Sequence, residues 1–239
     1  MRLRTAVHGT GPRRIALVHG LGGSGKTWQP LVGKILAVGG RSVTTVDLRG
    51  HGTSPAGAGY TLAEYAADLV ETLPTGLDAV VGHSLGGAVV AAAAERLAPR
   101  RAVYLDPGFR LGLPTARWFW AVPAVTMGAV ALASMPGRAR IRSRFAPEDR
   151  ALIEEARAGT ARGVLIPTFR DVTRHPLTPG PPPVPSTVVL SAEGPSVVPD
   201  TLAAELAEAG WEIRHVPELH HEFWLEDVTA TFAAVRDLL

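Results

Sequence analysis

The chain has 239 residues, of which 46% are hydrophobic and 19% are charged, and this composition is typical of a globular protein rather than a disordered one. It contains no cysteine, which excludes a disulfide framework, thiolate catalysis and metal sites with cysteine ligands. The formal net charge of +2 is too small to indicate binding of nucleic acid.

Short apolar runs alternate with longer helical patterns along most of the chain. Thr61 followed by Glu64 has the form of a capping box, which predicts a helix start at this point. Alternation of this kind predicts a mostly parallel sheet with helices on both faces, and ligands bind such sheets beyond the carboxyl ends of the strands. The predicted strands are 15–18, 43–46, 79–81, 102–105, 187–190 and 212–216, and the predicted helices are 61–73, 85–98, 199–209 and 228–239.

The alternation stops between residues 107 and 186. Two helical patterns, 147–158 and 163–172, lie in this segment, which closes with the proline-rich stretch 178–185. We expect a core formed by residues 1–106 and 187–239, and a helical lid formed by residues 107–186. The arginines at 138, 140, 142 and 144 are interpreted as a solvated face of the lid, with binding of an anionic substrate as the alternative.

One uncharged stretch in this lid, residues 118–135, needs comparison with a membrane span. At about 18 residues it lies at the lower limit for crossing a bilayer. It contains Pro123 and Gly128, and most of its apolar residues are alanine or valine. We therefore expect a buried or substrate-facing helical pair and no stable membrane span. The N-terminal residues lack the apolar segment of a signal peptide, so we expect a cytoplasmic protein.

Residues 20–27, GLGGSGKT, follow the first predicted strand and fit the phosphate-binding pattern G-x-x-x-x-G-K-[ST] at every position. Asp47, at the end of the second predicted strand, begins a D-x-x-G motif and could ligate magnesium. These two motifs alone would indicate a nucleotide-hydrolysing enzyme.

A third motif favours a different interpretation. Residues 82–86, GHSLG, lie between a predicted strand and a predicted helix, the context in which G-x-S-x-G marks a nucleophile elbow. Small residues two positions either side of Ser84 allow a sharp turn that exposes its hydroxyl. The helix that starts there directs its positive end toward developing negative charge.

The order of these motifs resembles that of the α/β-hydrolase family. The resemblance implies a mostly parallel sheet flanked by helices, with an inserted helical lid. It also accounts for the glycines of the first motif and gives Asp47 a role in a turn, so a phosphate loop is disfavoured; no N-K-x-D guanine signature occurs. The similar segments are the family's oxyanion loop at 19–23, its D-x-R-G-x-G-x-S turn at 47–54, its nucleophile elbow at 82–87, and its catalytic-histidine segment at 220–227 (HHEFWLED).

This resemblance implies a serine triad. Ser84 is the expected nucleophile, and it needs a base because a serine hydroxyl is nearly inert at neutral pH. Alignment of the last segment with the family makes His221 the base, with the adjacent His220 as the alternative. The backbone N–H groups of Leu21 and Leu85 are the expected oxyanion donors.

The acid that orients His221 has two candidates. The family usually places it after the strand predicted at 187–190, where Glu193 lies. Some members of one branch, the haloalkane dehalogenases, carry it after the preceding strand, and residues 191–198 (SAEGPSVV) resemble their corresponding segment. We therefore favour Asp106, although an aspartate before a proline can also simply form a turn. Those dehalogenases use an aspartate nucleophile, so the likeness does not extend to Ser84.

A serine nucleophile implies acyl-enzyme chemistry. We expect hydrolysis of an ester or lactone of an apolar small molecule, with a thioester or amide, carbon–carbon cleavage, and acyl transfer or cyclisation as alternatives on the same triad. Trp118 and Trp120 are expected to line the substrate pocket, although core packing explains either residue equally well. No cofactor or metal is expected. The alternative from another class is a protein of this fold that binds a ligand without turnover.

Overall fold

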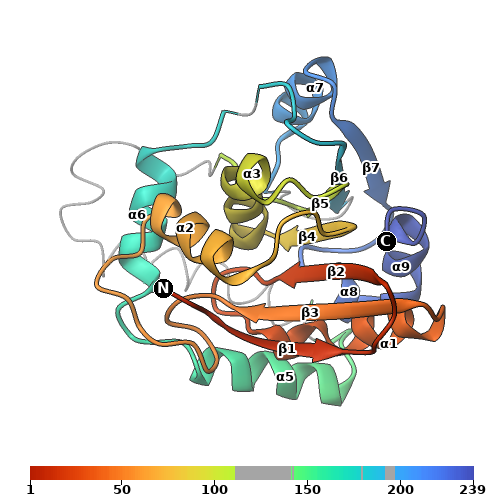
Figure 1. Cartoon of the computed structure of the whole chain (residues 1–239), viewed down its shortest axis with the longest axis horizontal. Helices are drawn as coiled ribbons and strands as arrows, with labels where there is room; N and C mark the ends of the chain where they lie inside the picture. The colour runs from red at the N-terminus through yellow and green to blue at the C-terminus, as the bar shows by residue number, and fades with distance from the viewer. Residues whose placement is uncertain (111–140, 142, 179, 192–196) are drawn as a thin grey trace.

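The computed structural model describes residues 1–110, 141, 143–178, 180–191 and 197–239. Within these residues, seven strands form one sheet with the order β1-β3-β2-β4-β5-β6-β7 (Figure 1). Strand β1 pairs antiparallel with β3, and every other neighbouring pair is parallel, which confirms the prediction of a mostly parallel sheet. The strands are β1 Arg4–His8, β2 Arg13–Val18, β3 Arg41–Asp47, β4 Ala79–His83, β5 Ala102–Leu105, β6 Ser186–Ser191 and β7 Glu212–Val216.

The apolarity of each strand matches its place in the sheet. Strands β4 and β5 lie in the middle, read AVVGH and AVYL, and are buried along their whole length. Such strands need no polar face, because helices cover both sides of the sheet. The edge strands β1 and β7 read RTAVH and EIRHV and are mostly exposed or half-buried. Strand β1, which was not among the predicted strands, therefore lacks the apolar run that marks the central strands.

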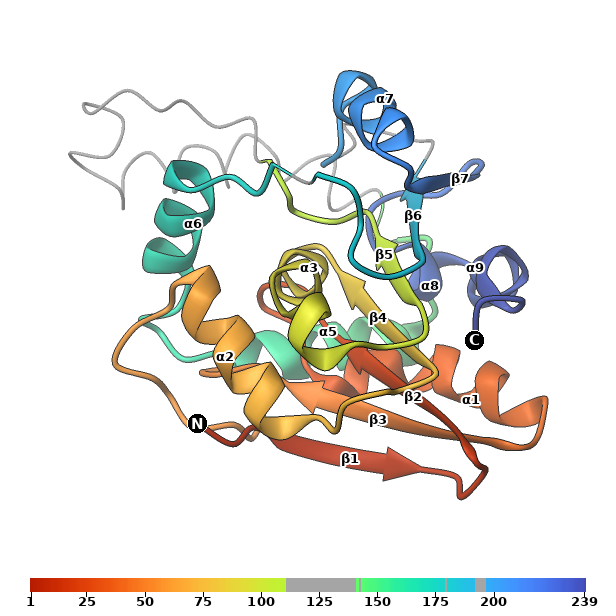
Figure 2. The same ribbon diagram turned by 45° about the horizontal axis from the view of Figure 1, so that its top comes forward.

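Helices pack against both faces of the sheet and enclose two apolar clusters. One cluster contains Tyr65 of α2 and Val89 of α3, and these two helices lie side by side (Figure 2). The other contains Ile35 of α1, Phe223 of α8 and Val235 of α9. The capping box at the start of α2 is confirmed. The helices of the core are η1 Gly25–Trp28, α1 Gln29–Ala37, α2 Leu62–Thr72, α3 Leu85–Leu97, α7 Asp200–Glu208, α8 Phe223–Glu226 and α9 Val228–Val235.

Two further helices lie in the segment between β5 and β6. Helix α5, Pro147–Ala158, has the predicted bounds, and α6, Leu165–Arg174, begins and ends two residues later than predicted. The hydroxyl of Thr168 in α6 lies 3.0 Å from that of Tyr65, so α6 rests beside α2 (Figure 2). The predicted helical pair at 118–135 lies outside the described residues. Within the described part of the chain, no helix is both long and apolar enough to cross a membrane.

Candidate active site

Ser84 occupies the tight turn between β4 and α3. Its backbone has φ 50° and ψ −118°, a conformation that residues other than glycine rarely adopt and that persists only where the surroundings enforce it. Backbone hydrogen bonds hold Ser84 in this conformation, and one of them joins the N–H of Ala88 to the carbonyl of Ser84 at 3.2 Å. The N–H of Ser84 donates to the carbonyl of Leu105 at 3.1 Å, and its own carbonyl accepts from Gly87 at 3.0 Å and Gly108 at 2.9 Å.

The two glycines of the G-x-S-x-G motif are required by close backbone contacts. A Cβ atom added to Gly82 would lie 2.5 Å from the carbonyl oxygen of Gly86. One added to Gly86 would lie 2.3 Å from the carbonyl oxygen of Val18, at the end of β2. The motif thus reflects the tight packing of α3 against the central strands, and this packing holds Ser84 half-buried at the carboxyl edge of the sheet.

Asp106 and His221, which are 115 positions apart, meet beside this turn. Asp106 follows β5, is fully buried and has φ 41°. Its Oδ2 lies 2.6 Å from Nδ1 of His221 and accepts a second hydrogen bond from the Ser191 hydroxyl at 3.3 Å. A carboxylate on Nδ1 keeps the proton there and makes Nε2 the basic nitrogen of the imidazole. The side chain of His221 is 29% exposed, so it borders the solvent.

The adjacent His220 points to a different carboxylate. Its Nδ1 lies 3.1 Å from both oxygens of Glu226, and its N–H donates to Glu226 Oε2 at 2.9 Å. Of the two histidines considered from the sequence, His221 is therefore the one brought to Asp106. Glu193, the other candidate acid, and the pocket candidates Trp118 and Trp120 lie outside the described residues.

His83, the second residue of the elbow motif, contacts both the backbone and the ring of His221. Its Nε2 lies 3.1 Å from the carbonyl oxygen of His221, and the two ring centroids are 4.4 Å apart. The edge of Trp224 packs on the same ring, also at 4.4 Å. Burial, reinforced by the neighbouring His221, holds the pKa of His83 well below its usual range, so its neutral ring donates to that carbonyl. The G-x-S-x-G motif allows any residue at this position, so it did not indicate a role for His83. Only the location of His83 at the carboxyl end of a central strand could have indicated one.

Two more buried histidines brace the loop formed by residues 19–23. Nε2 of His19 accepts from the N–H of Leu48 at 3.0 Å, which leaves Nδ1–H to donate to the carbonyl of Gly20 at 2.7 Å. Nε2 of His51 accepts from the N–H of Gly22 at 3.1 Å. Burial lowers the pKa of His19 to about 3 and lowers that of His51 as well, so both rings are neutral, as these hydrogen bonds require.

This loop lies against the serine turn. A Cβ atom added to Gly20 would lie 3.0 Å from Cβ of Ser84 and 2.8 Å from Nδ1 of His83. Leu21 is the next residue of the loop, and Leu85 is the first residue of α3. The two residues expected to supply oxyanion donors therefore flank Ser84 from two different strand ends.

The phosphate-loop interpretation does not fit the geometry of residues 20–27. Lys26 Nζ points to α5 and pairs with Glu155 at 2.5 Å. The N–H of Gly25 donates to Asp47 Oδ1 at 2.7 Å, while the N–H and hydroxyl of Thr53 donate to Asp47 Oδ2 at 2.8 and 2.9 Å. The lysine is thus engaged by the segment between β5 and β6, and Asp47 stabilises a turn.

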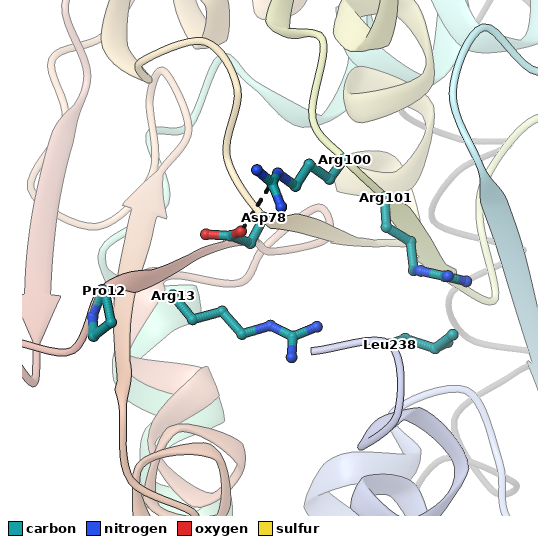
Figure 3. A pocket seen from close by; sticks show the side chains of 6 residues that line it. All are labelled: Pro12, Arg13, Asp78, Arg100, Arg101 and Leu238. Atoms are coloured by element: carbon teal, nitrogen blue, oxygen red, sulfur yellow. Dashed lines mark ion pairs between the residues drawn. The ribbon is translucent and has the colours of Figure 1, made fainter.

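A small cavity of about 50 Å³ adjoins the loop at 19–23. Gly20 to Gly23 line one side, and Ile153 and Arg157 of α5 line another. A larger cavity of about 510 Å³ lies elsewhere, at the amino end of the sheet (Figure 3). Its lining includes Arg13 and Arg100, which are exposed, and Arg101, which is half-buried. Ligands of parallel sheets bind at the carboxyl end, so the smaller cavity belongs to the candidate site and the larger one does not.

A serine in a strained strand-to-helix turn, an adjoining glycine-rich loop and a buried carboxylate on a histidine together define a hydrolase of the α/β type. Residues 15–235 match the family described as "Alpha/beta hydrolase family", and the chain belongs to that family.

Among solved structures, the chain is similar to the enol-lactonase from Burkholderia xenovorans LB400, with 26% identity and a TM-score of 0.78 over 99% of this chain and 95% of that one. It has the same TM-score, at 17% identity, with an esterase from Exiguobacterium antarcticum over 98% and 94% of the two chains, a likeness of fold alone.

Curated relatives match over shorter stretches. A putative carbamate hydrolase, RutD, from Variovorax paradoxus is 44% identical over 95 residues, which cover 37% of this chain and 35% of the relative. The lipase LipV from Mycobacterium tuberculosis is 35% identical over 107 residues, which cover 43% of this chain and 40% of the lipase. The chain thus matches well under half the length of these relatives.

Proposed function

We propose that the protein is a serine hydrolase that cleaves an ester or lactone of an apolar small molecule through an acyl-enzyme intermediate. The observation that carries the proposal is the 2.6 Å contact between Asp106 and His221 beside the strained turn of Ser84. A buried carboxylate on Nδ1 fixes the tautomer in which Nε2 can accept the proton of a serine hydroxyl.

The proposed reaction has two halves. In the first, His221 Nε2 takes the proton of the Ser84 hydroxyl while Oγ attacks the substrate carbonyl, and the N–H groups of Leu21 and Leu85 stabilise the oxyanion. The protonated His221 then gives its proton to the departing alkoxide, and the acyl group stays on Ser84. In the second half, His221 removes a proton from water as the water attacks the acyl carbonyl; the bond to Ser84 Oγ then breaks, the protonated His221 returns its proton to Oγ, and the acid is released. With a lactone, both product groups remain in one hydroxy acid.

The relatives support this choice of bond. The enol-lactonase aligns over almost the whole of both chains, and its name describes lactone chemistry. The name of the lipase describes ester chemistry, and the carbamate hydrolase suggests a carbamate as a further assay substrate. The apolar character of the substrate rests on Trp118 and Trp120 in the sequence and stays a prediction.

A serine-directed fluorophosphonate probe tests the proposal most directly. The wild-type protein is expected to be labelled at Ser84 and to hydrolyse short nitrophenyl esters. Ser84→Ala is expected to abolish both, with its circular dichroism spectrum unchanged. Equal labelling or turnover in the alanine variant would remove Ser84 from the mechanism. A folded wild type that neither reacts with the probe nor cleaves esters, lactones or carbamates would favour a binding protein instead.

A further inference from the structure

The segment that carries His221 has no regular secondary structure of its own. Residues 217–222 form turns between the edge strand β7 and the short helix α8, and Glu218 has a φ of 61°. Packing of Leu219, which is 8% exposed, in the apolar cluster around Phe223 holds part of this segment, and hydrogen bonds must hold the residues next to the histidine. The carbonyl of His221 is held by His83 and its imidazole by Asp106.

The residue before the histidine is held by Glu226. The side chain of Glu226 is only 4% exposed, and its Oε2 accepts from the N–H of His220 at 2.9 Å. A carboxylate so well buried is stable in its charged form only with a paired cation or several hydrogen bonds. The position of the backbone next to His221 thus depends on what neutralises Glu226.

Arg144 supplies that charge from a distant part of the chain. Its Nη1 lies 2.6 Å from Glu226 Oε1 and also contacts the carbonyl of Glu218 at 3.5 Å. The neighbouring Phe145 is 3% exposed and belongs to the same apolar cluster as Phe223 of α8, so this end of the segment is anchored beside the histidine. The sequence interpretation placed Arg144 on a solvated arginine face, and its side chain is indeed 52% exposed, but its guanidinium also pairs with the buried carboxylate of Glu226.

We propose that Arg144 is a positioning residue for the reaction: through Glu226 it fixes the backbone at His220 and thereby the imidazole of His221. The inference rests on the proposed function of His221 as the base. Arg144 enters from the segment between β5 and β6, which also carries α5 and α6, so this segment and the base are mechanically linked. Displacement of a catalytic group by about 1 Å can cost a hundredfold in rate, which makes such a link relevant to turnover.

The chain offers a matched control. Lys26 and Glu155 form a second ion pair between the same segment and the core, at 2.5 Å, with both side chains more than half exposed. Neither residue contacts the histidine segment in the hydrogen bonds and ion pairs of the described residues. Glu155→Gln therefore removes a comparable link without touching Glu226.

The test compares kcat and KM of Arg144→Met, Glu226→Gln and Glu155→Gln on the same ester substrate. Arg144→Met and Glu226→Gln are each expected to lower kcat by about ten- to a hundredfold with little change in KM. Because the two residues act as one unit, the double variant should lose no more than either single variant.

Arg144→Lys keeps the charge and should recover part of the loss. Glu155→Gln should match wild type. Wild-type kcat in both Arg144→Met and Glu226→Gln would overturn the proposal, and should one of them fail to fold, the other decides alone.

Amide hydrogen exchange of residues 219–222 gives a readout that does not depend on turnover. Exchange should be faster than wild type in Arg144→Met and unchanged in Glu155→Gln. If the wild-type protein has no hydrolase activity, the proposed function fails, but this comparison still tests the link. Identical exchange in the two variants would show that Arg144 does not hold the segment.

Discussion

In the proposed mechanism, Asp106 is the acid that orients His221. Its side chain is completely buried, so its charge would be costly without partners. It receives hydrogen bonds from the imidazole of His221 and the hydroxyl of Ser191. Its positive φ directs the chain away from β5 at the point where the carboxylate reaches the histidine. The sequence left open that this aspartate only forms a turn before Pro107. The turn is present, and the carboxylate also contacts the imidazole of His221.

Asp106→Asn is expected to lower kcat of the proposed reaction by about 10⁴-fold, the effect seen when a serine protease loses this charge. The amide keeps the shape of the side chain but no longer stabilises the imidazolium that forms when Ser84 loses its proton. Steady-state kinetics on a nitrophenyl ester measure the loss, and thermal unfolding checks that stability is retained. Glu193→Gln is the control and should be mild. If Glu193→Gln were inactive and Asp106→Asn nearly normal, the acid would lie after β6.

At the scale of the element, the start of α3 shows how closely the elbow is packed. The Cβ atoms that Gly82 and Gly86 lack would meet backbone carbonyl oxygens, which cannot move aside as a flexible side chain can. The glycines of the motif are therefore a packing requirement of the helix and the strands, in addition to allowing the turn at Ser84.

Gly86→Ala should destabilise the fold by about 1–3 kcal/mol, because its methyl group would lie 2.3 Å from the carbonyl oxygen of Val18. Gly33→Ala in α1 is the matched control, since nothing lies within 4 Å of its added Cβ. Alanine favours a helix interior over glycine by up to about 1 kcal/mol, so the Gly33 variant should be slightly more stable than wild type. Urea unfolding of both variants measures the difference, and equal stability of the two would contradict the packing argument.

Most elements follow from local patterns, and the exceptions have physical causes. Strands β2 to β7, the capping box at Thr61 and helix α5 were predicted, because each is encoded within a few residues. Edge strand β1 was not among the predicted strands, because its exposed residues need no apolar run.

In the site, the elbow around Ser84 is local and was predicted as a motif. The contact of His221 with Asp106 depends on the order of β4, β5 and β6 in the sheet, so the sequence alone left Glu193 open. The roles of these residues stay predictions.

For the whole molecule, three buried neutral histidines should make stability depend on pH. Burial lowers the pKa of His19 to about 3 and also lowers those of His51 and His83. In the unfolded chain these rings take up protons below about pH 6.5, whereas the folded chain resists protonation. Their contribution to stability is therefore complete above about pH 6.5 and is lost progressively as pH falls toward 3.

The melting temperature should accordingly drop between about pH 6.5 and 5, a range in which most carboxylates remain ionised. Differential scanning calorimetry across this range measures the effect. His175, whose side chain is 74% exposed, provides the control, because His175→Gln should leave the profile unchanged. A melting temperature that stays constant from pH 7 to 5 would contradict the neutral assignment of the buried rings.

The position of the histidine segment has a consequence for the order in which the protein loses its activity and its fold. Ser84 follows a central strand that is paired on both sides, whereas His221 follows β7, which lies at the edge of the sheet and is paired only with β6 among the described strands. Edges open locally at a lower free energy than the centre of a fold. A molecule whose edge has opened would keep most of its secondary structure and the turn of Ser84, yet the proposed base would no longer lie beside that serine. Loss of activity and loss of the fold are then separate events, and inactivation comes first and can be reversed while the central strands stay paired.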